Sequence, residues 1–366
     1  MATLWVGSRK GLFRYDQTAA GWQPAGPPAF LAEPVSAFLD DPRDGALYIS
    51  LYHGHFGCKL QRSDDRGLTW VELPSPAYPK SDAPDAPALE FIWCFAAGGA
   101  DEPGVIWAGT LPGGLFKSTD RGQTWVLNAA LWTVPGRDKW FGAGYDHPGV
   151  HSICVDPRDS RHIVIAVSIG GVWITRDGGD SWTIGGYGLR NEYMPPDQAQ
   201  TPELQDAHLI AACTADPDRI WCQHHNGIFV SDDGGMNWRE SENVKPSAFG
   251  FAVAPHPTDR DRAWFAPARK DEYRVPVDAR LVVTETRDGG LTYASLSDGL
   301  PQDDAYDLIY RHALVIDRTG NRLAMGSTTG GLWVSDDQGA NWQLLSAHLP
   351  PIACLTFAPG PLHPEP

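Results

Sequence analysis

Histidine is the residue type whose number and grouping in this chain best suit a chemical role. Four short polar segments carry it, at residues 52–55 (YHGH), 145–151 (YDHPGVH), 205–208 (QDAH) and 223–226 (QHHN). Neutral imidazole is the most common metal ligand in proteins, and nitrogen ligands suit Zn²⁺, Fe²⁺ and copper. Rings converging from several segments could therefore hold one such ion. The candidate ligands are His53, His55, His151, His208, His224 and His225.

Two other interpretations of these histidines stay open. The rings could contact a polar ligand or act as acids and bases without a metal, with His151 and His208 as the catalytic candidates. They could instead only hydrogen-bond the backbone of loops. No compact motif such as HExxH is present, so a shared site requires the fold to bring separate segments together.

Acidic, basic and aromatic residues near the same segments suit a polar substrate. Glu90 and Asp304 each lie at the start of an expected inner strand, and two facing carboxylates can act as an acid–base pair on a glycosidic bond. Arg269 and Arg274 could bind a carboxylate or phosphate, although a solvated charged loop is the more ordinary interpretation. The aromatic candidates for contact with a sugar-like ligand are Trp93, Trp140, Tyr145 and Tyr306.

An internal repeat reveals the elements that must position these residues. Six segments share the pattern Ser/Thr-x-Asp-x-Gly-x-Thr/Ser/Asn-Trp/Tyr, at residues 63–70, 118–125, 175–182, 231–238, 286–293 and 335–342, and a degenerate copy spans residues 15–22. The closing aromatic residues lie roughly 48 to 57 residues apart, a period typical of repeated supersecondary units. Short strand-like runs flank each copy, and Asp and Gly are turn residues. Each copy therefore predicts a turn between two strands.

The strand count around these turns predicts the architecture. Second strands are expected at residues 3–8, 46–50, 105–110, 163–168, 220–225, 263–268 and 322–327, and innermost strands at residues 35–39, 91–95, 151–155, 209–213, 249–253 and 312–316. The missing seventh innermost strand is expected at residues 352–359, after the last repeat. We predict an all-β, seven-bladed β-propeller, a single domain over residues 1–366, whose C-terminal strand completes the N-terminal blade and leaves no exposed sheet edge.

Propeller topology then assigns each loop to one of two faces. The repeated turns and the first-to-second strand loops belong to one face, called the bottom. The second-to-third strand loops and the links between blades belong to the opposite face, called the top, where propellers usually bind ligands. Seven of the twelve histidines map to the top face. The expected pocket is at this mouth of the ring.

The repeated turn is similar to the Asp box, and the chain resembles the Asp-box (BNR-repeat) superfamily along nearly its whole length. That superfamily includes sialidases, xyloglucanases, sortilin-type receptors and photosystem assembly factors, and the nearest resemblance is to bacterial proteins described as sialidase-like or as BNR-repeat glycosyl hydrolases. The resemblance implies the propeller fold. In this superfamily Asp boxes lie away from the active site, so they say little about activity.

Several activities of the superfamily fit this chain poorly. A sialidase needs an Arg-Ile-Pro signature in the first blade, whereas Arg14 here is followed by Tyr15 and Asp16, so sialidase activity is not expected. A xyloglucanase resembling the family would span two propellers. Sortilin-type receptors carry more blades and a cysteine-rich region, and the photosystem factors are exported. The resemblance leaves the activity open.

Composition restricts the partners. The chain carries 29 basic and 45 acidic residues, a net charge of −16, which argues against nucleic acid as a partner. No membrane span, signal peptide or nucleotide-cofactor motif is expected, and a cytoplasmic location follows by default. The six cysteines show no CxxC spacing and are expected to be free thiols.

These expectations converge on a function. We expect an enzyme of the hydrolase or lyase type that acts on a small polar or sugar-like ligand, with a transition metal (Zn, Fe or Cu) as its candidate cofactor. The alternatives are a non-catalytic propeller that binds a ligand or serves as a scaffold, and a glycosidase that uses Glu90 and Asp304. A deep polar pocket favours the enzyme, whereas a flat or plugged top face favours the scaffold.

Overall fold

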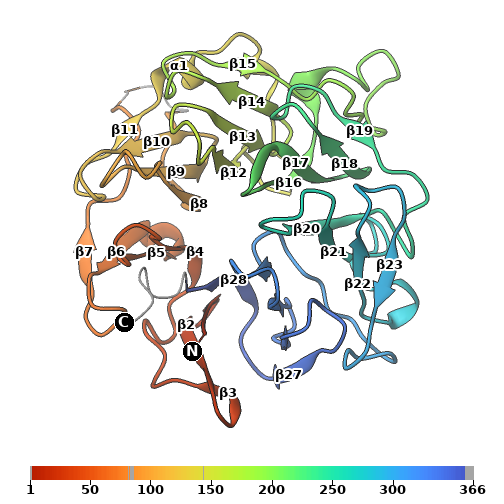
Figure 1. Ribbon diagram of the computed structural model, residues 1–366. Coiled ribbons are helices and arrows are strands. Elements are labelled where there is room, and N and C mark those ends of the chain that lie inside the picture. The colour runs from red at the N-terminus through yellow and green to blue at the C-terminus, as the bar shows by residue number, and fades with distance from the viewer. Residues whose placement is uncertain (1, 81, 83–85, 143, 359–366) are drawn as a thin grey trace.

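A computed structural model describes residues 2–80, 82, 86–142 and 144–358. Seven four-stranded antiparallel sheets are arranged in a ring (Figure 1). The first sheet has the order β28 (Ile352–Phe357), β1 (Thr3–Ser8), β2 (Gly11–Thr18) and β3 (Gly21–Pro24). The second has β4 (Val35–Asp40), β5 (Leu47–Tyr52), β6 (Cys58–Ser63) and β7 (Val71–Leu73). The third has β8 (Phe91–Ala97), β9 (Ile106–Leu111), β10 (Leu115–Ser118) and β11 (Val126–Leu127).

The remaining four sheets repeat this order from the inside of the ring to the outside. They contain β12 (Val150–Val155), β13 (Ile163–Val167), β14 (Gly171–Thr175) and β15 (Thr183–Ile184); β16 (Ala207–Cys213), β17 (Asp216–His224), β18 (Gly227–Ser231) and β19 (Arg239–Glu240); β20 (Gly250–Pro255), β21 (Ala263–Pro267), β22 (Val283–Thr286) and β23 (Ala294–Leu296); and β24 (Leu314–Ile316), β25 (Leu323–Gly326), β26 (Leu332–Ser335) and β27 (Gln343–Ser346). The described helices are short: α1 (Ala129–Trp132), η1 (Gly54–Phe56), η2 (Arg137–Lys139), η3 (Pro202–Leu204) and η4 (Val277–Ala279). No helix in the described ranges has the length and apolar character needed to cross a membrane.

The predicted all-β, seven-bladed propeller is confirmed, including its closure. Strand β28 pairs antiparallel with β1, with Leu4 opposite Phe357 and Gly7 opposite Cys354. It also contacts the inner strands of both neighbouring blades, β24 and β4. The C-terminal strand therefore completes the first blade. The predicted run of residues 352–359 ends in the structure at Phe357, and Pro359 lies outside the described residues.

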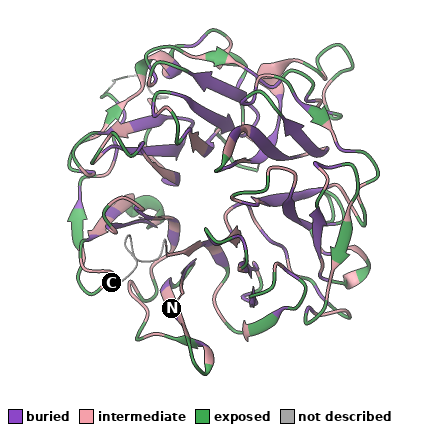
Figure 2. Cartoon of the chain, viewed as in Figure 1, coloured by how far each residue is buried: buried purple, intermediate pink, exposed green. Residues whose placement is uncertain are grey.

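The hydrophobic core lies between neighbouring blades, where sheets pack face to face. Figure 2 shows the burial concentrated on the inner strands of the blades and the exposure on the outermost strands and the loops. Every residue of β9, β13 and β14 is buried. Trp107, Trp221 and Trp264 occupy equivalent places on β9, β17 and β21 and are among the largest fully buried side chains. The six cysteines are free thiols, as expected.

The repeated turns are closed by their own side chains. In the turn that follows β14, the Asp177 carboxylate accepts hydrogen bonds from the Thr175 hydroxyl at 2.6 Å and from the Ser181 N–H at 2.9 Å. The hydrogen bond that the Ser181 hydroxyl donates to Asp177 at 2.5 Å, together with these two, holds the pKa of Asp177 well below its usual range. Gly179 donates its N–H to the Thr175 hydroxyl at 3.0 Å. The half-buried Trp182 donates from Nε1 to Asn128 at 3.0 Å, which ties the turn to the preceding blade.

Candidate functional site

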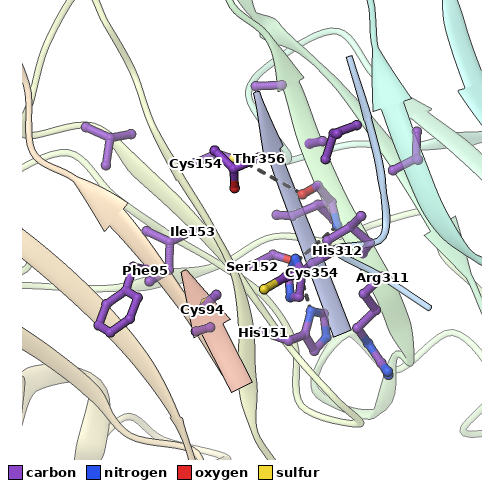
Figure 3. Close-up of a pocket in the computed structure, with 18 of the residues that line it drawn as sticks. Cys94, Phe95, His151, Ser152, Ile153, Cys154, Arg311, His312, Cys354 and Thr356 are labelled. Atoms are coloured by element: carbon purple, nitrogen blue, oxygen red, sulfur yellow. Dashed lines mark hydrogen bonds between the residues drawn. The ribbon is translucent and has the colours of Figure 1, made fainter. Parts of the chain in front are cut away.

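A polar pocket of about 980 Å³ lies at one mouth of the ring. Its walls come from the starts of inner strands β8, β16 and β20 and from the β1–β2, β17–β18 and β21–β22 loops. These are segments that the sequence assigned to the top face. A second cavity of about 480 Å³ runs along the inner strands (Figure 3). Trp93 and Arg311 line both cavities, so they lie where the mouth pocket meets the central channel.

Three residues of the mouth pocket form a compact group: Asp206, His208 and His225. Asp206 directly precedes β16, His208 is its second residue, and His225 directly follows β17. Because β16 and β17 pair antiparallel, with Ala207 opposite His224, these chain segments meet at one edge of the sheet. Among the described residues, this is the group of His, Cys, Asp and Glu side chains whose ligand atoms lie within 4.8 Å of one another.

A β-bulge positions His208. The pairing register of β16 with β17 shifts between Ala207 and Leu209, so His208 is an extra residue without a partner on β17. The registers of β4, β8, β12, β20 and β28 shift in the same way near the same end of the strand. The extra residues on β8 and β12 are Trp93 and His151. A bulge re-aims a side chain, and all three of these side chains line a cavity.

The hydrogen bonds around His208 determine which of its nitrogens is free. His208 Nδ1 lies 2.6 Å from the carbonyl oxygen of Gly250, and a carbonyl only accepts, so Nδ1 carries the hydrogen. Burial lowers the pKa of His208 to about 4, so the ring is neutral at pH 7. Its Nε2 lone pair therefore faces the Asp206 carboxylate, 3.9 Å from Oδ2. Two electron-rich atoms facing each other in a buried place suit a cation between them.

Asp206 is buried, with 2% of its surface exposed, and is ionised. Burial opposes its charge, but the surrounding imidazoles outweigh this effect and hold the pKa well below its usual range. Oδ2 accepts a hydrogen bond from the Tyr193 hydroxyl at 3.2 Å and lies 3.3 Å from His225 Nδ1. Burial also opposes charge on His225, yet the contact with Asp206 raises its pKa. Asp206 Oδ1 is buried and has no hydrogen-bond partner among the described residues, which leaves a coordinating oxygen unused.

The other predicted histidine ligands lie apart from this group. His53 Nε2 is 3.0 Å from Glu33, and neither His53 nor His55 lines a described cavity. His224 is fully buried, and its ring accepts backbone N–H bonds from Asp206 or Asn226 at 3.2 Å. His151 lines the channel cavity and contacts Ser152 through Nδ1 at 2.8 Å. The structure therefore brings together two of the six predicted histidines, His208 and His225, and adds Asp206.

The predicted carboxylate pair does not meet in this pocket. Glu90 lies 3.9 Å from His147, and Asp304 is exposed with a positive φ of 52°. Neither residue is part of the lining of either described cavity. The geometry therefore offers no support for Glu90 and Asp304 as an acid–base pair.

Three of the predicted aromatic and basic residues line the mouth pocket, and three do not. Trp93, Tyr145 and Arg274 line the mouth pocket. Trp140 is instead a core residue that packs on Trp173 and Arg137. Arg269 stacks on Tyr273, and Tyr306 is exposed, and neither lines the pocket.

Several residues that line the mouth pocket were not predicted from the sequence. Tyr193, Phe249, Phe251 and Arg311 were not selected, although all four line the mouth pocket. Phe251 stacks on the His208 ring at 4.4 Å between centroids. Arg311 directly precedes His312, which occupies in the seventh blade the position that His151 and His208 occupy in theirs.

Comparisons with known proteins give relatives among xyloglucanases. No family model matches the chain. It is 24% identical over 272 residues to a probable oligoxyloglucan-reducing end-specific xyloglucanase of Neosartorya fischeri, covering 66% of this chain and 30% of that protein. It is 33% identical over 176 residues to the corresponding enzyme of Emericella nidulans, covering 47% of this chain and 19% of that protein. The chain thus spans less than a third of the length of these curated relatives.

Solved structures share the fold at low sequence identity. An ancestral GH74 enzyme superposes with a TM-score of 0.58 at 16% identity, covering 88% of this chain and 38% of that one. YCF48 bound to D1 peptide gives a TM-score of 0.53 at 14% identity, covering 85% and 82%. The protein is therefore a seven-bladed propeller with GH74 and YCF48 propellers as structural neighbours, and these structures carry the fold alone.

Proposed function

We propose that this protein is an enzyme of the hydrolase or lyase type that binds a small, polar, sugar-like substrate in the mouth pocket. The observation that carries the proposal is the group of Asp206, His208 and His225, where a buried carboxylate faces an imidazole lone pair inside a substrate-sized cavity. The volume and polar lining of this pocket favour an enzyme over a scaffold with a flat face. The xyloglucanase names of the two curated relatives support a sugar ligand.

We further propose that these three residues hold a divalent transition metal. Two imidazole nitrogens and a carboxylate form a ligand set suited to Zn²⁺, Fe²⁺ or copper, and three protein ligands leave a coordination position for substrate or water. A metal bound there would polarise a substrate oxygen or activate water. The bond from His208 Nδ1 to Gly250 is the type of contact that orients a metal-binding ring.

The remaining pocket residues have supporting roles in this proposal. The Tyr193 hydroxyl donates to Asp206 and orients its carboxylate. Phe251 lies parallel to the His208 ring and restricts its rotation. Trp93 and Tyr145 pack edge to face at 5.2 Å and present an aromatic wall on which a sugar ring can lie.

Metal analysis of protein purified without a nickel column tests the proposal. We expect about one equivalent of a single transition metal per chain, and cleavage of oligosaccharides that stops when a chelator removes it. His208→Gln and Asp206→Asn keep the side-chain volume and remove a ligand, so both should lower the metal content to less than about a tenth of an equivalent.

The matched control is His147→Gln, since His147 is exposed and lies outside the pocket lining. It should retain the full metal content. Wild-type protein that stays below a tenth of an equivalent after incubation with each metal would refute the metal centre.

A further inference from the structure

The guanidinium of Arg311 is buried and forms no ion pair with any described residue. Its side chain comes from the link before β24, and 8% of its surface is exposed. None of the described residues forms an ion pair with it within 4.0 Å, and its Nε atom is buried without an acceptor. Because an arginine stays protonated, its burial without a partner is unfavourable.

Aromatic rings hold this guanidinium at the floor of the mouth pocket. It lies over the Trp93 ring at 4.9 Å and near the Phe251 ring at 5.6 Å. Figure 3 shows Arg311 beside His151 and His312 at one end of the channel cavity. Burial lowers the pKa of both histidines, so the neighbouring rings are neutral and Arg311 is the charge of this junction.

The acidic residues of the pocket each have another partner. Asp271 pairs with Arg274 at 2.5 Å, and Glu272 pairs with Lys270 at 3.2 Å. Glu192 pairs with Arg190, which lies outside the pocket lining. Asp206 contacts His225 at 3.3 Å. The negative charges of the pocket are therefore engaged, and Arg311 is left to a ligand.

We infer that the mouth pocket receives a sugar acid whose carboxylate pairs with Arg311. The sugar part of this inference rests on the proposed function, whereas the anionic part rests on Arg311 alone. A guanidinium presents two parallel N–H groups that match the two oxygens of a carboxylate. The guanidinium of Arg311 lies against two aromatic rings, a setting that suits the flat carboxylate group.

The place of Arg311 also sets the direction in which the substrate lies. Arg311 and the group of Asp206, His208 and His225 line the same cavity. A carboxylate at Arg311 would therefore point the rest of the sugar away from the channel and along the wall of Trp93 and Tyr145. Arg311 acts in this arrangement as a specificity-determining residue, because it selects substrates by charge.

Calorimetric titration of the protein with three small sugars tests this inference. Glucuronate and glucose share a ring, but only glucuronate carries a carboxylate. Glucose 6-phosphate carries a phosphate on the same ring. We expect glucuronate to bind about tenfold or more tightly than glucose. Arg311→Met, which keeps the length of the side chain and removes its charge, should abolish that preference.

Arg269→Met is the matched control, because Arg269 lies in the adjacent loop and outside the pocket lining, and it should keep the preference. Thermal unfolding separates a binding role from a structural one. Replacing an unpaired buried charge by an apolar side chain should leave Tm equal or higher, so a lower Tm of Arg311→Met with an unchanged sugar preference would overturn the inference.

The other outcomes are also decisive. Equal binding of glucose and glucuronate overturns the inference and leaves the proposed enzyme standing. Tighter binding of glucose 6-phosphate than of glucuronate overturns the choice of a carboxylate. Absence of metal contradicts the proposed metal centre, yet it leaves the glucuronate preference and its dependence on Arg311 unaffected, so the two failures are distinguishable.

Discussion

At the scale of single residues, neighbours in sequence have opposite roles in this site. His224 and His225 are adjacent, yet the ring of His224 accepts a hydrogen bond from a backbone N–H group, whereas His225 contacts Asp206 in the pocket. The sequence predicted that both lie at the mouth of the ring, but it did not distinguish the directions of their side chains. That difference arises because β17 ends at His224, and side chains alternate between the faces of a strand.

The proposed metal should also stabilise the fold, since a ligand that binds only the native state raises the free energy of unfolding. We expect Tm to fall by a few degrees when a chelator removes the metal, and to recover when the metal is returned. His208→Gln should show neither change, because it lacks a ligand in both conditions. Differential scanning calorimetry of both proteins, each with and without chelator, provides the measurement. Equal chelator responses in the two proteins would contradict the assignment of His208.

At the scale of elements, the bulges near the start of the inner strands explain why the site was only partly foreseen. The expected strands were correct, and the side chains of a regular strand alternate between its two faces. Each of these three inner strands instead contains one extra residue, Trp93, His151 or His208, which interrupts that alternation. No glycine or proline marks these three positions in the sequence. The bulge appears only in the pairing register, so its effect on side-chain direction required the structure.

The repeated turns supply a prediction with an internal control, because Gly178 and Gly179 are adjacent and both have positive φ, +77° and +98°. A Cβ on Gly179 would lie 2.6 Å from Asn128 Nδ2, whereas one on Gly178 would meet only Arg161 Cγ at 3.8 Å. Gly179→Ala should therefore lower the free energy of unfolding by about 2 kcal/mol, and Gly178→Ala by about 1 kcal/mol or less. Urea denaturation of both variants measures the difference.

The chain itself supports this ranking. Arg66 and Arg121 occupy the place of Gly178 in two other turns and have positive φ values of 60° and 61°. A side chain is therefore tolerated there, while all six turns keep glycine at the place of Gly179. Equal destabilisation by the two substitutions would show that backbone strain, and not the contact with Asn128, governs this turn.

At the scale of the whole molecule, the fold was predictable because its signals are local and repeated. The aspartate turns recur, and each strand is a short apolar run, so counting them gave seven blades and the C-terminal completion of the first. The site depends on long-range relations that no local pattern records. Asp206 and His225 meet through strand pairing, and the isolation of Arg311 depends on which carboxylates other cations have already engaged.

The contact between β1 and β28 closes the ring, and a single substitution there should affect the stability of the whole structure. A Cβ on Gly7 of β1 would lie 2.5 Å from Cys354 Sγ on β28 and 2.9 Å from Val35 Cγ1 on β4, so Gly7→Ala pushes apart the strands that join the first and second blades. We expect a single, cooperative unfolding transition at a lower Tm, with a loss of about 2 kcal/mol. Cys354→Ala alone should destabilise by leaving a small cavity, yet in the double variant it makes room for the new methyl group. The two effects should then be non-additive by more than about 0.5 kcal/mol, as residues in contact require. Additive losses in a double-mutant cycle measured by calorimetry would contradict this account of the closure.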